Sequence, residues 1–123
     1  MKAMGFAEFG GPEVLVEMDV PLPVPAPGQI TIDVAWAGVN FVEILLRQGK
    51  VPGMSAPFVP GLEVSGRVAA LGEGVTEFAI GQPVMAFTHS GYAARIAVDG
   101  RLAAPLDRPG KAVGLRDAAG LPC

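Results

Sequence analysis

The chain has 123 residues, enough for one domain with a core of its own but few for a two-domain enzyme. Hydrophobic residues make up 50% of the sequence and charged residues 17%, a balance that excludes a disordered chain. The net charge of −3 without a Lys/Arg cluster indicates no nucleic-acid or membrane partner. No apolar run forms a signal peptide or reaches the roughly 18 residues of a membrane span. We therefore expect a cytoplasmic protein.

Short valine-rich segments separated by 17 glycines and 12 prolines are typical of a turn-rich β domain. From 14 to 20 and again from 30 to 36, apolar residues recur at every second position, which predicts two strands. The proline-rich stretch 21–29 between them is expected to run extended and then turn. In the second strand, the residues predicted to share one side are Ile30, Ile32, Val34 and Trp36.

Asn40 stands between the second strand and a short helical pattern. With Asn40 as the N-cap, Glu43 falls at the third helical position, so the two residues can form a capping box. Val39 and Ile44 fit a hydrophobic staple, and Gly49 lies where a left-handed residue ends a helix. This spacing explains Asn40 without a functional role, yet a side chain at a strand-to-helix junction can also line a cleft, so both interpretations stay open.

Three further strands are predicted at 62–71, 82–87 and 92–98, with glycine-containing turns between them. Roughly five to eight short strands at this spacing predict a mainly β fold, a closed or partly open barrel with one or two short helices. The final stretch 114–123 contains helix formers, but Gly120 and Pro122 would cut any helix short.

Few side chains could carry chemistry. His89 lies in a predicted turn and is either a solvated loop histidine or a general acid or base at the mouth of a pocket. Glu63 begins an apolar strand and is either an exposed strand end or a partly buried carboxylate suited to proton transfer. One histidine and the single Cys123 do not supply the three or four ligands of a zinc site. Glu77 replaces the third glycine of a dinucleotide-binding loop, so we expect neither a metal nor a cofactor on this chain.

The order of several motifs resembles the N-terminal half of quinone oxidoreductases, which are zinc-independent, NADPH-dependent members of the medium-chain dehydrogenase/reductase superfamily; polyketide enoyl reductases are similar. The motifs are "MKAMGFAEFGGPEVLV", "AGVNFVEILLRQG", "APFVPGLEVSGRV" and "GYAARIAV". The resemblance implies that residues 1–123 form a single GroES-like domain, one wall of an active site, and that NADPH is carried by a Rossmann domain missing from this sequence. We therefore expect this chain to bind no nucleotide alone and to use NADPH only when that domain is supplied.

The resemblance also implies residue roles. Asn40 would face the nicotinamide and the substrate, and Glu43 stands for the usual aspartate of the motif. Some family members carry tyrosines at the positions of Phe41 and Leu45, so this sequence departs from them there. The candidate catalytic residues are Asn40, Glu63 and His89, and the candidate substrate contacts are Phe41, Leu45 and Tyr92.

Three functions stay open at this point. The chain could be the substrate-side half of a quinone or enoyl reductase, a stand-alone cofactor-free enzyme such as a cyclase or isomerase, or a non-catalytic binding module. We expect a small hydrophobic substrate such as a quinone, an enone or a polyketide-like compound. An apolar face left by the missing domain, including Leu121, would favour a homodimer.

Overall fold

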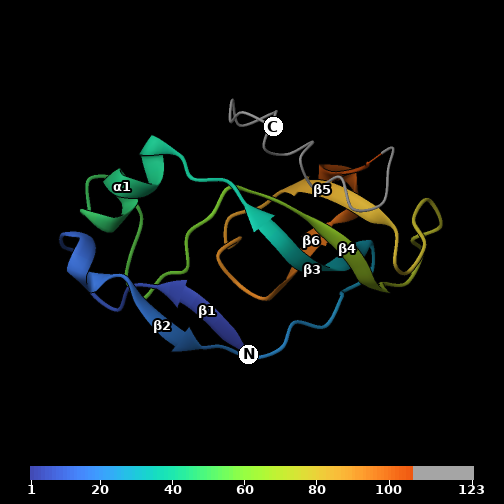
Figure 1. The fold of residues 1–123 in the computed structure, drawn as a ribbon, viewed down its shortest axis with the longest axis horizontal. Helices are drawn as coiled ribbons and strands as arrows, with labels where there is room; N and C mark the ends of the chain where they lie inside the picture. The colour runs from blue at the N-terminus through green and yellow to red at the C-terminus, as the bar shows by residue number, and fades with distance from the viewer. Residues whose placement is uncertain (107–123) are drawn as a thin grey trace.

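Seven strands and one α-helix make up the part of the chain that the computed structural model describes, residues 1–106 (Figure 1). Strands β1 (Lys2–Gly5) and β2 (Val16–Asp19) pair antiparallel and form a small sheet. The helix, α1 (Phe41–Arg47), lies beside this small sheet in Figure 1. Two short 3-10 helices lie at Pro12–Val14 and Gly100–Leu102.

A second sheet contains the other five strands, all antiparallel, in the order β6-β3-β4-β5-β7. Its outer strands, β6 and β7, do not pair with each other in the described residues, so the sheet stays open. The mainly β and partly open architecture predicted from the sequence is therefore confirmed. The strand bounds are β3 (Gln29–Ala37), β4 (Glu63–Leu71), β5 (Pro83–Phe87), β6 (Arg95–Asp99) and β7 (Ala103–Pro105).

The core lies against one side of the five-stranded sheet and consists mainly of β-branched residues. Their alternate positions on β3 to β6 bring them together, and each is less than a tenth exposed. Burial of one such side chain contributes about 1.5–3 kcal/mol, so this cluster dominates the stability of the domain. The buried residues of the cluster are Ile30, Ile32, Val64, Val68, Phe78, Val84, Ala86, Ile96 and Val98.

The alternation predicted for 30–36 fails at its end. Ile30 and Ile32 are fully buried, but Trp36 is 47% exposed. The register between β3 and β4 shifts between Val34 and Trp36, because Ala35 is an extra residue on β3. A β-bulge of this kind turns the following side chain to the other face, which explains why Trp36 does not join the core.

The first strand was not predicted, because the four residues of β1 carry only small residues on their inner face. Ala3 is buried, and a Cβ on Gly5 would lie 2.5 Å from the carbonyl oxygen of Phe58. The predicted strand 14–20 is the shorter β2, whose Val16 is 45% exposed rather than buried. The stretch 114–123, with Leu121 and Cys123, lies outside the described residues. No helix in the described part of the chain has the length and hydropathy of a membrane span.

Candidate functional site

Helix α1 begins at the junction predicted from the sequence. Asn40 is the N-cap in extended conformation, and Asn40 and Glu43 are placed as a capping box. The backbone N–H of Asn40 donates to Oε1 of Glu43 at 2.5 Å. Gly49 follows the helix with a φ of +75°, as a left-handed glycine should. The predicted start and end of the helix are confirmed, although Val39 is 77% exposed and packs little as a staple residue.

Glu43 turns into the protein rather than toward solvent. It is 5% exposed and shares the buried face of α1 with Leu46, three residues further on. One carboxylate oxygen, Oε1, holds the helix start. The other, Oε2, is buried and has no hydrogen-bond partner within 3.5 Å among residues 1–106. A buried acceptor of this kind is uncommon in folded proteins, which makes Glu43 a candidate functional residue.

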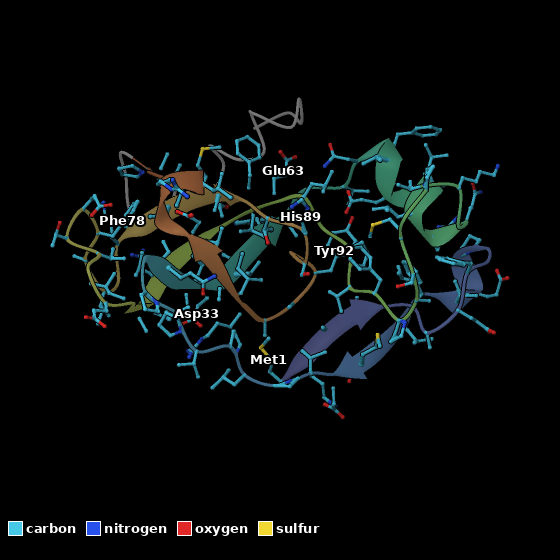
Figure 2. The ribbon with its side chains drawn as sticks, turned by 180° about the vertical axis from the view of Figure 1, so that it is seen from behind. Met1, Asp33, Glu63, Phe78, His89 and Tyr92 are labelled. Carbon is cyan, nitrogen blue, oxygen red and sulfur yellow. The ribbon has the colours of Figure 1, made fainter. Side chains whose placement is uncertain are left out.

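Tyr92 comes from the segment before β6 and lies between the large sheet and α1 (Figure 2). Its backbone is held at both ends, since its N–H donates to the oxygen of Pro60 at 2.9 Å and its oxygen accepts from the N–H of Met4 at 2.7 Å. Burial raises the pKa of the Tyr92 phenol above its ordinary value, and the neighbouring Glu43 carboxylate raises this pKa further. The Glu43 carboxylate thus acts on the Tyr92 pKa both through a hydrogen bond and through its charge.

A cavity of about 100 Å³ lies between these groups and is lined by Asn40, Glu43, Arg47 and Tyr92, with apolar walls that include Leu15 and Pro60. The Arg47 guanidinium is held by the loop that follows β1, because its Nε donates to the backbone oxygen of Gly10 at 3.2 Å. The cavity thus combines amide, carboxylate and phenol groups in a mainly apolar surrounding. Such a site can orient a small polar group by hydrogen bonds.

A second, larger cavity of about 570 Å³ adjoins the first, and Leu15 and Tyr92 line both. Most of its wall consists of small or apolar residues of β1, β3 and the 91–94 segment, including Met4 and Val34. Two charged residues line it, Lys2 and Glu17, and they pair with each other at 3.1 Å. The volume suits a ligand with one or two rings, whose polar end would reach the smaller cavity past Tyr92.

The other predicted site residues lie apart from this cluster. Glu63 begins β4, is partly exposed, and its side chain lies against Gly38, where an added Cβ would clash with it. His89 is exposed and lines a separate cavity of about 520 Å³ (Figure 2). Phe41 is 73% exposed at the start of α1, and Leu45 is half-buried on the same helix. Of the six candidates, the structure therefore brings Asn40 and Tyr92 to one cavity.

Glu43 is a functional candidate that was predicted from the sequence as a capping residue and as the counterpart of the motif's usual aspartate, but not as a site residue. The signal was its spacing from Leu46, which places both residues on one face of a short helix whose apolar side must be buried. A charged residue on that face predicts a buried carboxylate. Tyr92 could not be paired with it from local sequence, because the two residues belong to distant segments.

The ionisation of Tyr92 provides a direct test of this cluster, because it is the sole tyrosine of the chain. We expect phenolate absorbance at 295 nm to appear in the folded protein at a pH above the ordinary tyrosine value of about 10. The unfolded chain then binds fewer protons above about pH 10, so the free energy of unfolding falls as pH rises past that value.

The control for this titration is Glu43→Gln, in which the phenolate should appear at lower pH than in the wild type because the neighbouring charge is removed. Glutamine keeps an acceptor for the capping box. Identical titration curves for the two proteins, with circular dichroism showing both folded, would mean that Glu43 does not act on the phenol.

The family follows from comparison with known proteins. Residues 26–114 match the model of the alcohol dehydrogenase GroES-like domain. The chain belongs to this family. Its resemblance to quinone oxidoreductases is also confirmed, because this GroES-like domain is 41% identical over 97 residues to quinone oxidoreductase of Rattus norvegicus, covering 76% of this chain and 30% of that protein.

Other relatives of the GroES-like domain extend this result. It is 40% identical over 90 residues to the synaptic vesicle membrane protein VAT-1 homolog-like of Homo sapiens, covering 72% of this chain and 22% of that protein. The crystal structure of the human VAT-1 homolog-like protein superimposes with a TM-score of 0.84 at 34% identity, covering 89% of this chain and 37% of that one. The Escherichia coli quinone oxidoreductase complexed with NADPH gives a TM-score of 0.81 at 29% identity, covering 86% of this chain and 33% of that one. The chain thus spans well under half the length of these relatives.

The described residues do not fit a whole nicotinamide dinucleotide. Its diphosphate is usually held by a glycine-rich turn that leads into a helix N-terminus. Among residues 1–106 the one α-helix is α1, and its first turn carries the buried carboxylate of Glu43, which has the same sign of charge as a diphosphate. No group of three or more His, Cys, Asp or Glu side chains in these residues could hold a metal ion.

Proposed function

We propose that this domain forms the substrate-side wall of an NADPH-dependent reductase acting on quinones or related enones, with the nucleotide held outside residues 1–123. The observation that carries the proposal is the identity of about two fifths to quinone oxidoreductases across most of the chain. The two cavities that share Leu15 and Tyr92 support it, because an apolar space for a ring adjoins a small space with polar groups that could hold a carbonyl group. The possible cyclase or isomerase activity has no comparable support.

Asn40 is the residue proposed to orient the substrate. In a capping box the amide oxygen faces the backbone N–H of the third helical residue, so the amide NH₂ stays available as a donor. The NH₂ group would donate to the substrate carbonyl oxygen, and the capped helix start would hold the Asn40 side chain in place. A donor fixed before the reaction stabilises negative charge that develops on such an oxygen. The cytoplasmic location and the homodimer stay predictions.

Two substitutions of Asn40 separate its structural role from the proposed one. Asn40→Asp keeps an N-cap acceptor but removes the donor, so we expect unchanged stability and a fall of about 100-fold in kcat/KM for quinone reduction. Asn40→Ala removes both groups and should also lower the free energy of unfolding by about 1 kcal/mol.

The assay uses a chimera in which residues 1–123 replace the matching third of the Escherichia coli quinone oxidoreductase, the remainder of which supplies the rest of the enzyme. Stability is measured by urea unfolding and activity by NADPH oxidation with a benzoquinone. Full activity of Asn40→Asp in a chimera that reduces quinones would limit Asn40 to helix capping.

A further inference from the structure

The cavity lined by His89 has no part in the proposed function. It has a volume of about 520 Å³ and lies between residues 57–59, the loop after β5 and the start of β6. Met1 and His89 both line it (Figure 2). Ala3 and Ala93 pair in an isolated β-bridge and line this cavity as well as the cavity of about 570 Å³. The alanine bridge therefore separates the two spaces.

The charge on the wall of the His89 cavity has one sign. Among the described residues that line it, the ionisable groups are the amine of Met1, the imidazole of His89 and the guanidinium of Arg95, and none is a carboxylate. These groups are cationic when protonated, whereas the whole chain has a net charge of −3. Positive groups in a recess with apolar walls attract anions more strongly than the same groups on a flat surface. The lining therefore favours an anionic ligand.

Arg95 has hydrogen-bond donors that the fold does not use. Its side chain is 31% exposed, so a ligand in the cavity can reach it. Within residues 1–106 its side chain makes one hydrogen bond, from Nε to Oδ1 of Asp33 on the neighbouring strand at 2.6 Å. The N–H groups of the terminal nitrogens have no protein partner in this part of the chain. Such a planar fork of donors matches the two oxygens of a carboxylate.

The rest of the wall restricts the body of the ligand. Most of it is apolar and includes Phe58, Val59 and Ile96, and the volume suits a small molecule with a ring. Thr88 adds a hydroxyl group, whose oxygen accepts from the N–H of Ser90 at 3.3 Å, so its O–H stays available as a donor. A multiply charged anion would lose its hydration against these apolar walls, which favours a monoanion.

We propose that the His89 cavity is a second ligand site, which binds a small organic carboxylate. The carboxylate group pairs with the terminal nitrogens of Arg95, and an apolar body of about one ring lies against Phe58 and Ile96. His89 is exposed at the edge of the cavity and adds positive charge when it is protonated. The site shares only the two alanines of the bridge with the cavities of the proposed reductase site, so the inference does not rest on that function.

The test is an equilibrium binding measurement on the 123-residue chain near neutral pH with two probes, 4-methylbenzoate and 4-methylbenzamide. The probes have the same ring and nearly the same shape, and they differ in one negative charge. Protein NMR titration gives the dissociation constants and locates the site. We expect the carboxylate to bind about tenfold more tightly than the amide, as for a charge-assisted hydrogen bond, with shifts at the backbone amides of residues 88–90 and 95–97. Equal affinities, no binding of the carboxylate, or shifts confined to the surroundings of Asn40 would overturn the inference.

Variants assign the preference to Arg95. Arg95→Gln should reduce the preference for the carboxylate to about twofold or less, because the charged fork is lost. The matched control is Arg67→Gln, which removes the same charge from an exposed arginine of β4 outside the cavity and should leave the preference unchanged.

Asp33→Asn gives an opposite expectation, because it removes the carboxylate that competes for Arg95. The probe carboxylate should then bind about two- to threefold more tightly, a gain that a purely structural role of Arg95 would not produce. Equal losses of preference in Arg67→Gln and Arg95→Gln would indicate general attraction by net charge and would overturn the inference. The wild-type comparison and Asp33→Asn still test the site if Arg95→Gln fails to fold. None of these measurements needs NADPH or turnover.

Discussion

Gly66→Ala is expected to unfold the domain or to lower its free energy of unfolding by about 4 kcal/mol or more, a loss seen only for severe structural conflicts. Gly66 lies on β4 opposite Val34, next to the bulge of β3. A Cβ at this position would overlap the carbonyl oxygen of Asp33 and approach Cγ2 of Ile32 to 3.1 Å. The main obstacle is backbone, which cannot rotate away as a side chain can, so β3 and β4 would have to separate across the core.

The matched control is Gly100→Ala, another buried glycine without a left-handed backbone. A Cβ there would lie 3.4 Å from the oxygen of Gly28 and 3.6 Å from the ring of Phe78, which are ordinary contacts. We expect a change of less than about 1 kcal/mol. Urea unfolding of the three proteins tests the prediction, and equal midpoints for Gly66→Ala and the wild type would show that the strands do not approach so closely.

Phe6→Ala should cost about 3–5 kcal/mol, the usual loss for a large buried aromatic side chain. Phe6 is 1% exposed, and its ring centroid lies 5.9 Å from that of Phe9 and 6.0 Å from that of Phe58. Its backbone also exchanges two hydrogen bonds of 2.9 Å with Phe58. Since Pro60 lines the small cavity two residues after Phe58, loss of this packing should also disturb Tyr92.

Phe87→Ala serves as the comparison for Phe6→Ala, because Phe87 is 60% exposed at the end of β5. Its removal should change the free energy of unfolding by less than about 1 kcal/mol. Thermal unfolding monitored by circular dichroism separates the two expectations. A loss in Phe6→Ala as small as that in Phe87→Ala would place Phe6 outside the folding core.

The fold could be predicted where local rules act alone. The helix start at Asn40 follows from capping chemistry within four residues, and its end follows from a left-handed glycine at Gly49. Strand β3 follows from the period of two in its apolar residues, and β4 follows from the glycine-containing turn that bounds it. The face on which Trp36 lies could not be predicted, because a bulge depends on the pairing of two strands and cannot be recognised from the sequence of one strand.

The candidate site could be predicted only in part, for the same reason. Asn40 and Tyr92 were named, but their meeting at one cavity depends on how the segment before β6 passes α1. Capping chemistry predicts the role of one Glu43 oxygen, whereas the burial of the residue and of its Oε2 depends on how α1 packs in the folded domain. Glu63 and His89 are candidates because of their side-chain chemistry, and side-chain chemistry alone does not determine which cavity a residue lines.

The most direct test of the proposed function is the binding and use of NADPH by two proteins, residues 1–123 alone and the chimera with the remainder of the Escherichia coli quinone oxidoreductase. The isolated chain should show no NADPH binding by fluorescence titration, whereas the chimera should bind NADPH and oxidise it in the presence of a quinone. Oxidation of NADPH by the isolated chain, or a folded chimera that binds NADPH and reduces no quinone or enone, would contradict the assignment of this domain as a substrate-side wall.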